Sequence, residues 1–191
     1  MILHHGLRIH KYADDSQVDI SVPVSDVQAA IHIFAVCVHD INKWMRASRL
    51  RLNPTKTQVM WLGSDQQLKR VDILVLSIAV SVVESARDLG VIIDSRLTLS
   101  SHVASLCRAG FYQLLQLCPL VQSMTTEVAR TVAAVFIACW LDYCNLLLYG
   151  LPETQLHKLQ SVQNATARLI TGTRRRDHIT PLLRQLHWLP I

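Results

Sequence analysis

Asp14 and Asp15 are the residues of this sequence with the clearest potential for chemistry. They are adjacent, follow Tyr12, and lie between the apolar segments 7–11 and 18–22, which predict the strands of a hairpin with both acids at its tip. Carboxylate oxygens are the ligands that Mg²⁺ prefers, and two metal ions about 4 Å apart can activate an attacking hydroxyl and stabilise a leaving pyrophosphate. An Asp-Asp pair is also common in solvated turns, so the rest of the chain must decide between the two interpretations.

The elements expected around this pair fall into two halves. In the first half, apolar residues spaced three or four apart over residues 27–45 predict an amphipathic helix. Short β-rich stretches follow at residues 57–62, 71–83 and 89–93. From residue 98 onward the pattern is typical of helices, expected at 100–117, 125–148 and 153–170, with breaks at Pro119, 150–152 and Gly172. The chain is therefore predicted to have an α+β fold in two domains, 1–96 and 97–191.

Composition excludes several classes of protein. The chain has 191 residues, half of them apolar and 17% charged, which is too apolar for a disordered chain and too short for a large multi-domain enzyme. The net charge of +5 is a moderate basic excess, compatible with a polyanionic partner. The uncharged runs at 73–83 and 131–141 are too short to span a bilayer, so we expect no membrane partner and no secretory signal.

The five cysteines are odd in number and widely spaced, and they include no C-x2-C pair. This pattern argues against a disulfide framework and against a zinc knuckle. We expect them to be small buried apolar residues in a reducing, intracellular compartment. His4, His5 and His10 have no carboxylate or thiol at a fixed spacing, so no metal site is expected there.

Tyr12-Ala13-Asp14-Asp15 resembles the Y/F-x-D-D box of reverse transcriptases. Longer stretches resemble, in order, the polymerases of non-LTR (LINE-like, jockey-type) retrotransposons: YADDSQ (12–17), DINKWMRASRLRLNPTKTQVMWLG (40–63), ARDLGVIID (86–94), LDYCNLLLYGLP (141–152) and LQSVQNATARLITGTRRRDHITPLLRQLHWLP (159–190). The resemblance implies an RNA-directed DNA polymerase, a nucleotidyltransferase that uses Mg²⁺, an RNA template and a DNA primer. It implies an incomplete polymerase palm (hairpin, helix and short strands) followed by an all-helical, thumb-like region, and a protein that works on nuclear DNA.

The resemblance also assigns roles to residues in the first half. Asp14 and Asp15 correspond to the metal-binding, catalytic aspartates, and Tyr12 to the aromatic residue beside the primer terminus. Lys56 lies where the family has a lysine near the incoming nucleotide, and a cation there could neutralise or protonate the departing pyrophosphate. An exposed loop lysine is the alternative. Where Asp19 stands the family usually has an apolar or aromatic residue, so Asp19 either adds negative charge near the metal pair or lies on the solvent face.

Other assignments concern primer and nucleic-acid binding. Leu89, Gly90 and Val91 resemble the primer-grip hairpin, in which a glycine would let backbone approach backbone; a glycine that serves only a tight turn is the alternative. A basic group is the candidate for phosphate contacts, consisting of Arg168, Arg174, Arg175 and Arg176. A solvated helix end is the alternative for this group. Trp140 and Trp188 are expected to be packing residues.

Only thirteen residues precede Asp14, so we expect the family's third palm carboxylate and its fingers to lie outside this chain. Two carboxylates alone would bind a cation weakly, and the isolated chain is expected to lack polymerase activity. An unpaired hairpin edge would favour self-association or pairing with the absent polymerase segments. The alternative functions are a non-enzymatic nucleic-acid-binding helical module and a helical interaction domain without a ligand.

Overall fold

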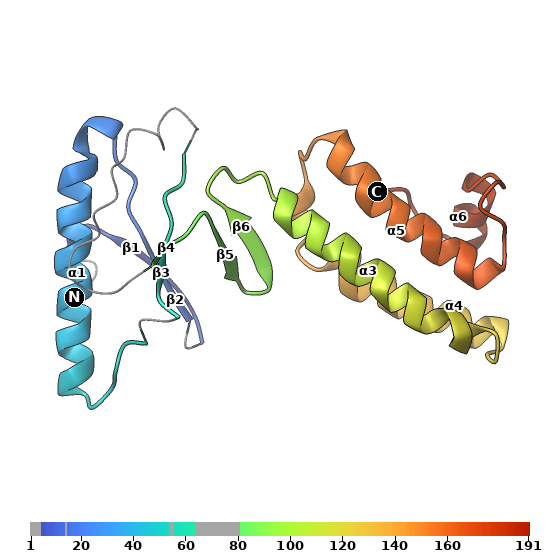
Figure 1. Ribbon diagram of the computed structural model, residues 1–191, viewed down its shortest axis with the longest axis horizontal. Coiled ribbons are helices and arrows are strands. Elements are labelled where there is room, and N and C mark those ends of the chain that lie inside the picture. Colours follow the sequence, from blue (N-terminus) through green and yellow to red (C-terminus); the bar gives the residue numbers. More distant parts are fainter. Residues whose placement is uncertain (1–4, 14, 54–55, 64–80) are drawn as a thin grey trace. The chain divides into compact units, whose positions relative to one another are not determined.

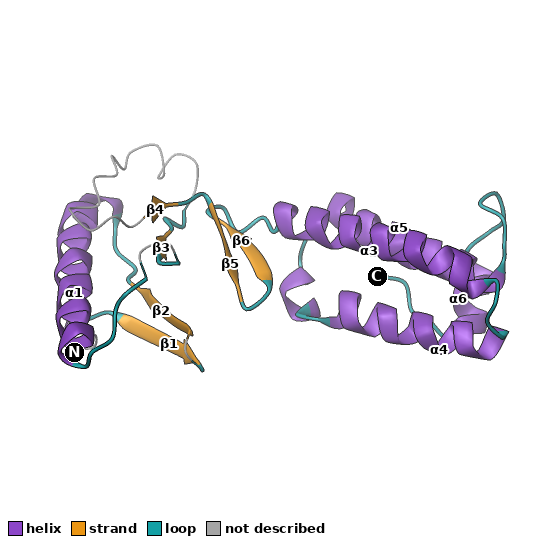
Figure 2. Ribbon diagram, turned by 60° about the horizontal axis from the view of Figure 1, so that its bottom comes forward, coloured by secondary structure: helices purple, strands orange, loops and turns teal. Residues whose placement is uncertain are grey.

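The computed structural model describes residues 5–13, 15–53, 56–63 and 81–191. The chain divides into two compact units, Met1–Ala86 and Arg87–Ile191. This division falls inside a short strand, about ten residues before the sequence-based boundary at residue 96, and the hairpin that contains this strand is described here with the second unit. The mixed α+β class predicted from the sequence is confirmed (Figures 1 and 2).

The first unit begins with the predicted hairpin. Strand β1 (Arg8–Tyr12) pairs antiparallel with β2 (Asp15–Asp19), and Tyr12 lies opposite Asp15 at the tip. The strands therefore reach the turn itself, beyond the limits expected from the apolar segments. Ala13 in the turn has a φ of 52°, as two-residue hairpin turns of this kind require. Among the described strands, no third strand joins this sheet.

Helix α1 (Val27–Ala47) follows a short 3-10 turn, η2 (Val24–Asp26), and confirms the amphipathic helix predicted over residues 27–45. Its buried side chains are Ala30, Ile31 and Cys37. The two remaining strands of this unit, β3 (Gln58–Val59) and β4 (Ser81–Val82), form a two-residue parallel pair. The β-rich stretch 57–62 is therefore mostly loop, and most of the stretch 71–83 lies outside the described residues.

The stretch Val24–Ala47 is 24 residues long with a mean hydropathy of 1.3 in its most apolar window, and by length and composition it could cross a membrane. Only 11% of that window is buried inside the protein. One such helix is a weak indication, because core helices and signal sequences meet the same criterion. The expectation of no membrane partner therefore stays a prediction.

The second unit consists of a hairpin followed by helices. Its elements in chain order are β5 (Ser85–Asp88), β6 (Val91–Asp94), α3 (Ser100–Val121), α4 (Thr126–Ile137), the π-helical turn η3 (Ala138–Asp142), the 3-10 turn η4 (Asn145–Leu148), α5 (Glu153–Thr171) and α6 (Thr180–Leu186). Helix α5 packs against α3, α4 and α6, and the C-terminal residues return between the helices (Figures 1 and 2).

Two helix ends in the second unit also differ from the sequence-based expectation. The break expected at Pro119 is wrong, because α3 continues through this residue to Val121. The proline ring fixes φ at a value compatible with a helix, and because Pro119 lies in the last turn of α3, few backbone hydrogen bonds of the helix are affected. The single helix expected over 125–148 is also wrong, since α4 ends at Ile137. Cys144 has a φ of 56°, and a residue in this left-handed conformation cannot continue a right-handed helix.

The core of the second unit has two apolar clusters. The first core cluster is formed by Val103, Leu141, Leu148 and Leu159. The second core cluster is formed by Ala129, Ala133 and Ile170, with Leu186 and Trp188 packed against it. Trp188 packs against this cluster, as predicted, and is half-buried, so part of the indole stays accessible. The side chain of Trp140 lies outside what the structure describes.

The cysteines agree only in part with their predicted burial. Cys37 is buried, Cys107 and Cys144 are half-buried, and Cys118 and Cys139 are exposed. The expectation of burial is wrong for Cys118 and Cys139. Both lie near an end of a helical segment, where few neighbouring residues cover a side chain. All five thiols are free.

Candidate nucleic-acid interface

The hairpin tip presents Tyr12 and Asp15 to solvent. Tyr12 is 68% exposed, and the exposed Asp15 is its direct cross-strand partner. Side chains of paired residues project from the same face of a sheet, so the tyrosine ring and this carboxylate share one face. Asp14, the other predicted catalytic and metal-binding residue, lies outside the described residues.

Asp19 occupies the other end of the hairpin, where it is paired with basic side chains. Arg8, its cross-strand partner, donates a hydrogen bond of 2.9 Å from Nε and forms an ion pair of 2.6 Å through a terminal nitrogen. His10 Nε2 lies 3.5 Å from the same carboxylate. The charge of Asp19 is thus balanced locally by Arg8, which favours the interpretation that it does not add to the charge at the tip.

Lys56 lies in the turn that follows Asn53, and its side chain is exposed. Within the described parts of the chain, no hydrogen bond or ion pair joins Lys56 to Tyr12 or Asp15. His5, one of the histidines considered as a metal ligand, instead contacts Asp40 at 3.0 Å. Among residues 5–13, 15–53, 56–63 and 81–191, no three His, Cys, Asp or Glu side chains form a group that could hold a metal ion.

The second hairpin places Leu89 and Gly90 at the turn between β5 and β6, with φ values of 43° and 87°. Leu89 was expected to begin a strand, and this is wrong because both turn residues adopt left-handed conformations. The hydroxyl of Tyr143 donates a hydrogen bond to the carbonyl oxygen of Leu89. A Cβ at Gly90 would lie 3.5 Å from the Tyr143 ring, an ordinary contact. The backbone conformation, rather than close approach, therefore explains the glycine.

Asp94 fixes the connection from this hairpin to α3. Its carboxylate accepts hydrogen bonds from the backbone N–H groups of Arg96, Thr98 and Leu99 and from the Thr98 hydroxyl, at 2.8 to 3.1 Å. Burial alone would raise the pKa of Asp94, but these hydrogen bonds stabilise the charged form and hold the pKa below its usual range. The approach to α3 is therefore rigidly defined.

His102 ties α3 to β6 on the other side of the same connection. Its ring is buried, and Nδ1 accepts a hydrogen bond of 3.3 Å from the N–H of Ile92. Burial lowers the pKa of His102, and the positive charge of Arg87 lowers it further. A neutral ring with an unprotonated Nδ1 is the state that this contact requires.

The predicted phosphate-binding arginines lie in the loop after α5. Arg174, Arg175 and Arg176, called here the basic turn, are all exposed. The N–H of Asp177 donates to the carbonyl of Arg174 at 3.1 Å, and the Asp177 carboxylate accepts from the N–H of Arg174 at 3.1 Å. These reciprocal bonds close the turn, with Arg175 and Arg176 at its two central positions.

Arg168 has a different environment from the basic turn, although both were predicted to contact phosphates. It lies in the last turns of α5, half-buried, and its terminal nitrogen donates a hydrogen bond of 3.3 Å to the carbonyl of Asp177. Its Nε is buried without a partner. Arg168 therefore holds the loop against α5, and the basic turn is the part that faces solvent.

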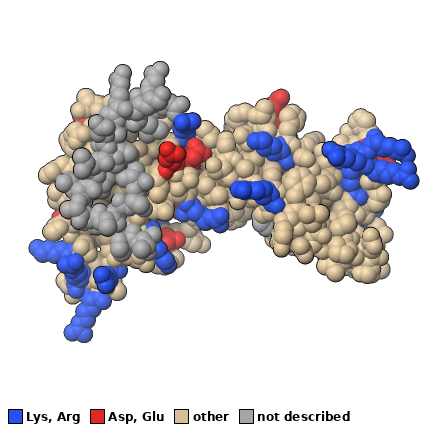
Figure 3. All heavy atoms as spheres, in the orientation of Figure 1, with Lys and Arg blue, Asp and Glu red and all other residues tan. Residues whose placement is uncertain are grey.

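Basic side chains are concentrated in this part of the second unit. Residues 154–191 contain six of the Lys and Arg residues and one acid, Asp177, whose carboxylate is engaged inside the loop. Figure 3 shows Lys and Arg side chains gathered at the end of the second unit, where α6 and the loop before it lie. This is a concentrated positive surface on a molecule of modest overall charge.

The described site residues therefore lie in four places: the first hairpin tip, the turn after Asn53 that contains Lys56, the turn of the second hairpin, and the end of α5 with the loop that follows it. Comparison with protein-family models, with curated proteins and with solved structures finds no match to this chain. Sequence reasoning missed Tyr143, which braces the second hairpin, and Arg130, which faces α6. Arg130 is the one basic residue of α4, and the helix is apolar after Thr131; that isolation was the available signal.

Proposed function

We propose that the chain is a nucleic-acid-binding part of a protein of the non-LTR retrotransposon reverse transcriptase family, and that its second unit binds the phosphate backbone through the basic turn. The ordered stretches that resemble this family support the family assignment. The observation that carries the binding function is the geometry of the basic turn: three consecutive exposed arginines on a hydrogen-bonded turn that Arg168 and Asp177 hold in place.

Physical chemistry favours phosphate as the ligand of such a turn. Each guanidinium has a planar fork of donors that matches phosphate oxygens. Because the backbone of the turn is already ordered, binding costs less conformational entropy than it would for a flexible loop. Each arginine that neutralises a phosphate also releases a condensed counterion, so the affinity should depend strongly on salt.

Binding of labelled oligonucleotides, followed by fluorescence anisotropy at low salt, tests this proposal. The full chain should bind both RNA and DNA, and the triple variant Arg174→Gln, Arg175→Gln, Arg176→Gln should lose most of that affinity. A matched control replaces three exposed arginines of the first unit, Arg46, Arg49 and Arg51, with glutamine. If the control variant loses as much affinity as the basic-turn variant, the binding site is elsewhere and the proposal is wrong.

Polymerisation by the first unit is the second candidate, and the hairpin tip supports it. Asp15 is exposed, and no described ion pair engages its carboxylate, so both oxygens are available to a cation. Tyr12 lies directly across from it, where an aromatic ring can pack on the sugar or base of a primer end. Bound Mg²⁺ would supply activation of the primer hydroxyl and neutralisation of the leaving pyrophosphate.

Metal binding and activity can be measured separately. Mn²⁺ should broaden the NMR signals of Tyr12 and Asp15, and Asp15→Asn should abolish this broadening. Asp19→Asn is the matched control, because its carboxylate is already paired with Arg8. Primer extension on an RNA template then tests catalysis. If the folded chain binds the template but incorporates no nucleotide, the chain acts as a binding module and not as a polymerase.

A further inference from the structure

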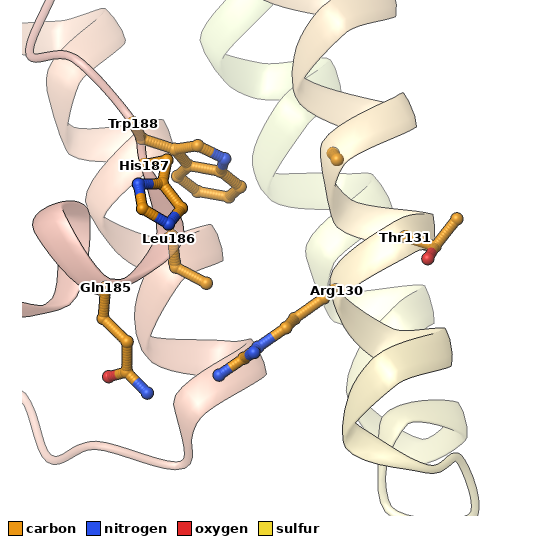
Figure 4. Close-up of a pocket in the computed structure, with 7 residues that line it drawn as sticks. Arg130, Thr131, Gln185, Leu186, His187 and Trp188 are labelled. Carbon is orange, nitrogen blue, oxygen red and sulfur yellow. The ribbon is translucent and has the colours of Figure 1, made fainter.

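A cleft lies between α4 and the end of α6. Its volume is about 270 Å³, and α4 contributes Arg130 and Ala134 while the end of α6 contributes Gln185, Leu186, His187 and Trp188. Figure 4 shows the Arg130 side chain reaching from α4 toward α6, with Gln185 on the facing side. The side chains of Arg130 and Trp188 both line this cleft.

Backbone hydrogen bonds at the end of α6 fix the position of Trp188 in the cleft. The N–H of Trp188 donates to the carbonyl of Leu183 at 2.9 Å, and the N–H of His187 donates to that of Arg184 at 3.1 Å. His187 has a φ of 57°, so the helix ends in a Schellman motif that turns Trp188 back toward α4. The buried Gln163 then holds the next residue, since its Nε2 donates to the carbonyl of Leu189 at 2.9 Å.

The lining of the cleft combines apolar, hydrogen-bonding and positively charged side chains. Trp188, Leu186 and Ala134 supply an apolar wall, while Gln185 and His187 can donate and accept hydrogen bonds. Arg130 adds a positive charge, and no carboxylate lines the described cleft. The volume lies just below the range of about 300–1,000 Å³ that suits drug-sized ligands. The cleft therefore suits one flat, hydrogen-bonding ring that carries a negative charge beside it.

We propose that this cleft accepts one unpaired nucleotide of a single-stranded nucleic acid, with the base against Trp188 and a phosphate at Arg130. This inference rests on the proposed function, in which the basic turn binds the backbone. Helix α6 connects the two sites and has seven residues, so it is about 10 Å long, and a strand of a few nucleotides can reach both. A duplex keeps its bases paired and stacked, so it cannot place one in the cleft without unpairing it.

The experiment compares a labelled single-stranded oligonucleotide with a duplex of the same length, using the full chain. Arg130→Gln removes a charge-assisted contact with phosphate, so it should weaken single-strand binding at least about fivefold and change duplex binding less than about twofold. Its matched control is Arg108→Gln, which removes one exposed arginine from α3 and should leave the ratio of the two affinities unchanged. Trp188→Phe keeps an aromatic packing residue and should also lower the single-strand preference.

A second measurement uses adenosine monophosphate and inorganic phosphate as separate probes. The mononucleotide should shift the indole N–H resonance of Trp188, whereas phosphate alone should not. Equal loss of single-strand and duplex binding in Arg130→Gln would overturn the cleft proposal and leave the basic turn as the binding site. Shifts caused equally by phosphate, or tighter binding of an acidic peptide than of the oligonucleotide, would also overturn it. Absence of all oligonucleotide binding by the unaltered chain would contradict the proposed function itself.

Discussion

Replacing Gly110 with alanine tests the contact between α3 and α5 on which the basic turn depends. A Cβ at Gly110 would lie 2.8 Å from Cγ1 of Val162, well inside the distance at which carbon atoms attract. Val162 is 2% exposed, and a β-branched side chain has essentially one rotamer in a helix, so it cannot move aside. The methyl group must therefore be accommodated by separating the two helices.

The magnitude follows from two opposing effects. Alanine is better than glycine in a helix by about 1 kcal/mol, whereas overpacking of a core costs about 1–3 kcal/mol. Gly110→Ala alone should lower the free energy of unfolding by about 1 kcal/mol. In a Val162→Ala background the obstructing methyl groups are absent, so the same change should raise the free energy of unfolding by about 1 kcal/mol.

Urea denaturation of the four proteins in this double-mutant cycle, followed by circular dichroism, measures the coupling between the two positions. We expect a coupling of about 2 kcal/mol, the difference between the effects in the two backgrounds. A coupling below about 0.5 kcal/mol, the scatter found for independent sites, would show that the helices do not approach at Gly110. The packing that places the loop after α5 would then be wrong.

Three further predictions concern groups around the candidate interface. Because the pKa of His102 is lowered from 6.5, the free energy of unfolding should fall as the pH drops below about 6.5; His102→Gln should reduce this fall in urea denaturation measured across a pH series. Asp94→Ala removes four hydrogen bonds and should lower the free energy of unfolding by about 1–2 kcal/mol, measured by urea denaturation. Equal stability of the variant and the unaltered chain would contradict the role of Asp94 in anchoring the connection to α3. Arg168→Leu should accelerate amide hydrogen exchange at Asp177 while the exchange of α5 stays slow; unchanged exchange at Asp177 would show that Arg168 does not hold the loop.

Helices with a strong local signal could be predicted from the sequence. The apolar spacing over residues 27–45 and 153–170 matches α1 and α5 closely. Gly172 ends α5 with a φ of 63°, as expected of a glycine after a helix. The segment 125–148 could not be predicted, because its apolar pattern continues through a π turn and a left-handed Cys144. Only contacts with residues distant in the sequence, such as that of Tyr143 with Leu89, select this shape.

The candidate interface was predictable in composition but not in arrangement. The run of arginines at 174–176 is visible in the sequence, whereas the role of Arg168 depends on the loop folding back to bring Asp177 within reach. Arg130 lies 55 residues before Gln185, and the cleft they share exists only because α4 and the end of α6 both pack on the second core cluster. Such long-range placement leaves no periodic signal. The tip of the first hairpin, in contrast, was predictable because its pairing is local.

The salt dependence of oligonucleotide binding tests the central claim most directly. For a single strand, each phosphate contact contributes about 0.7 to the slope of log affinity against log salt, so loss of three contacts in the variant Arg174→Gln, Arg175→Gln, Arg176→Gln should reduce the slope by about 2. The control variant with Arg46, Arg49 and Arg51 replaced should keep the slope of the unaltered chain. An unchanged slope in the basic-turn variant, or an equal reduction in the control, would contradict the assignment of the phosphate-binding surface to the loop after α5.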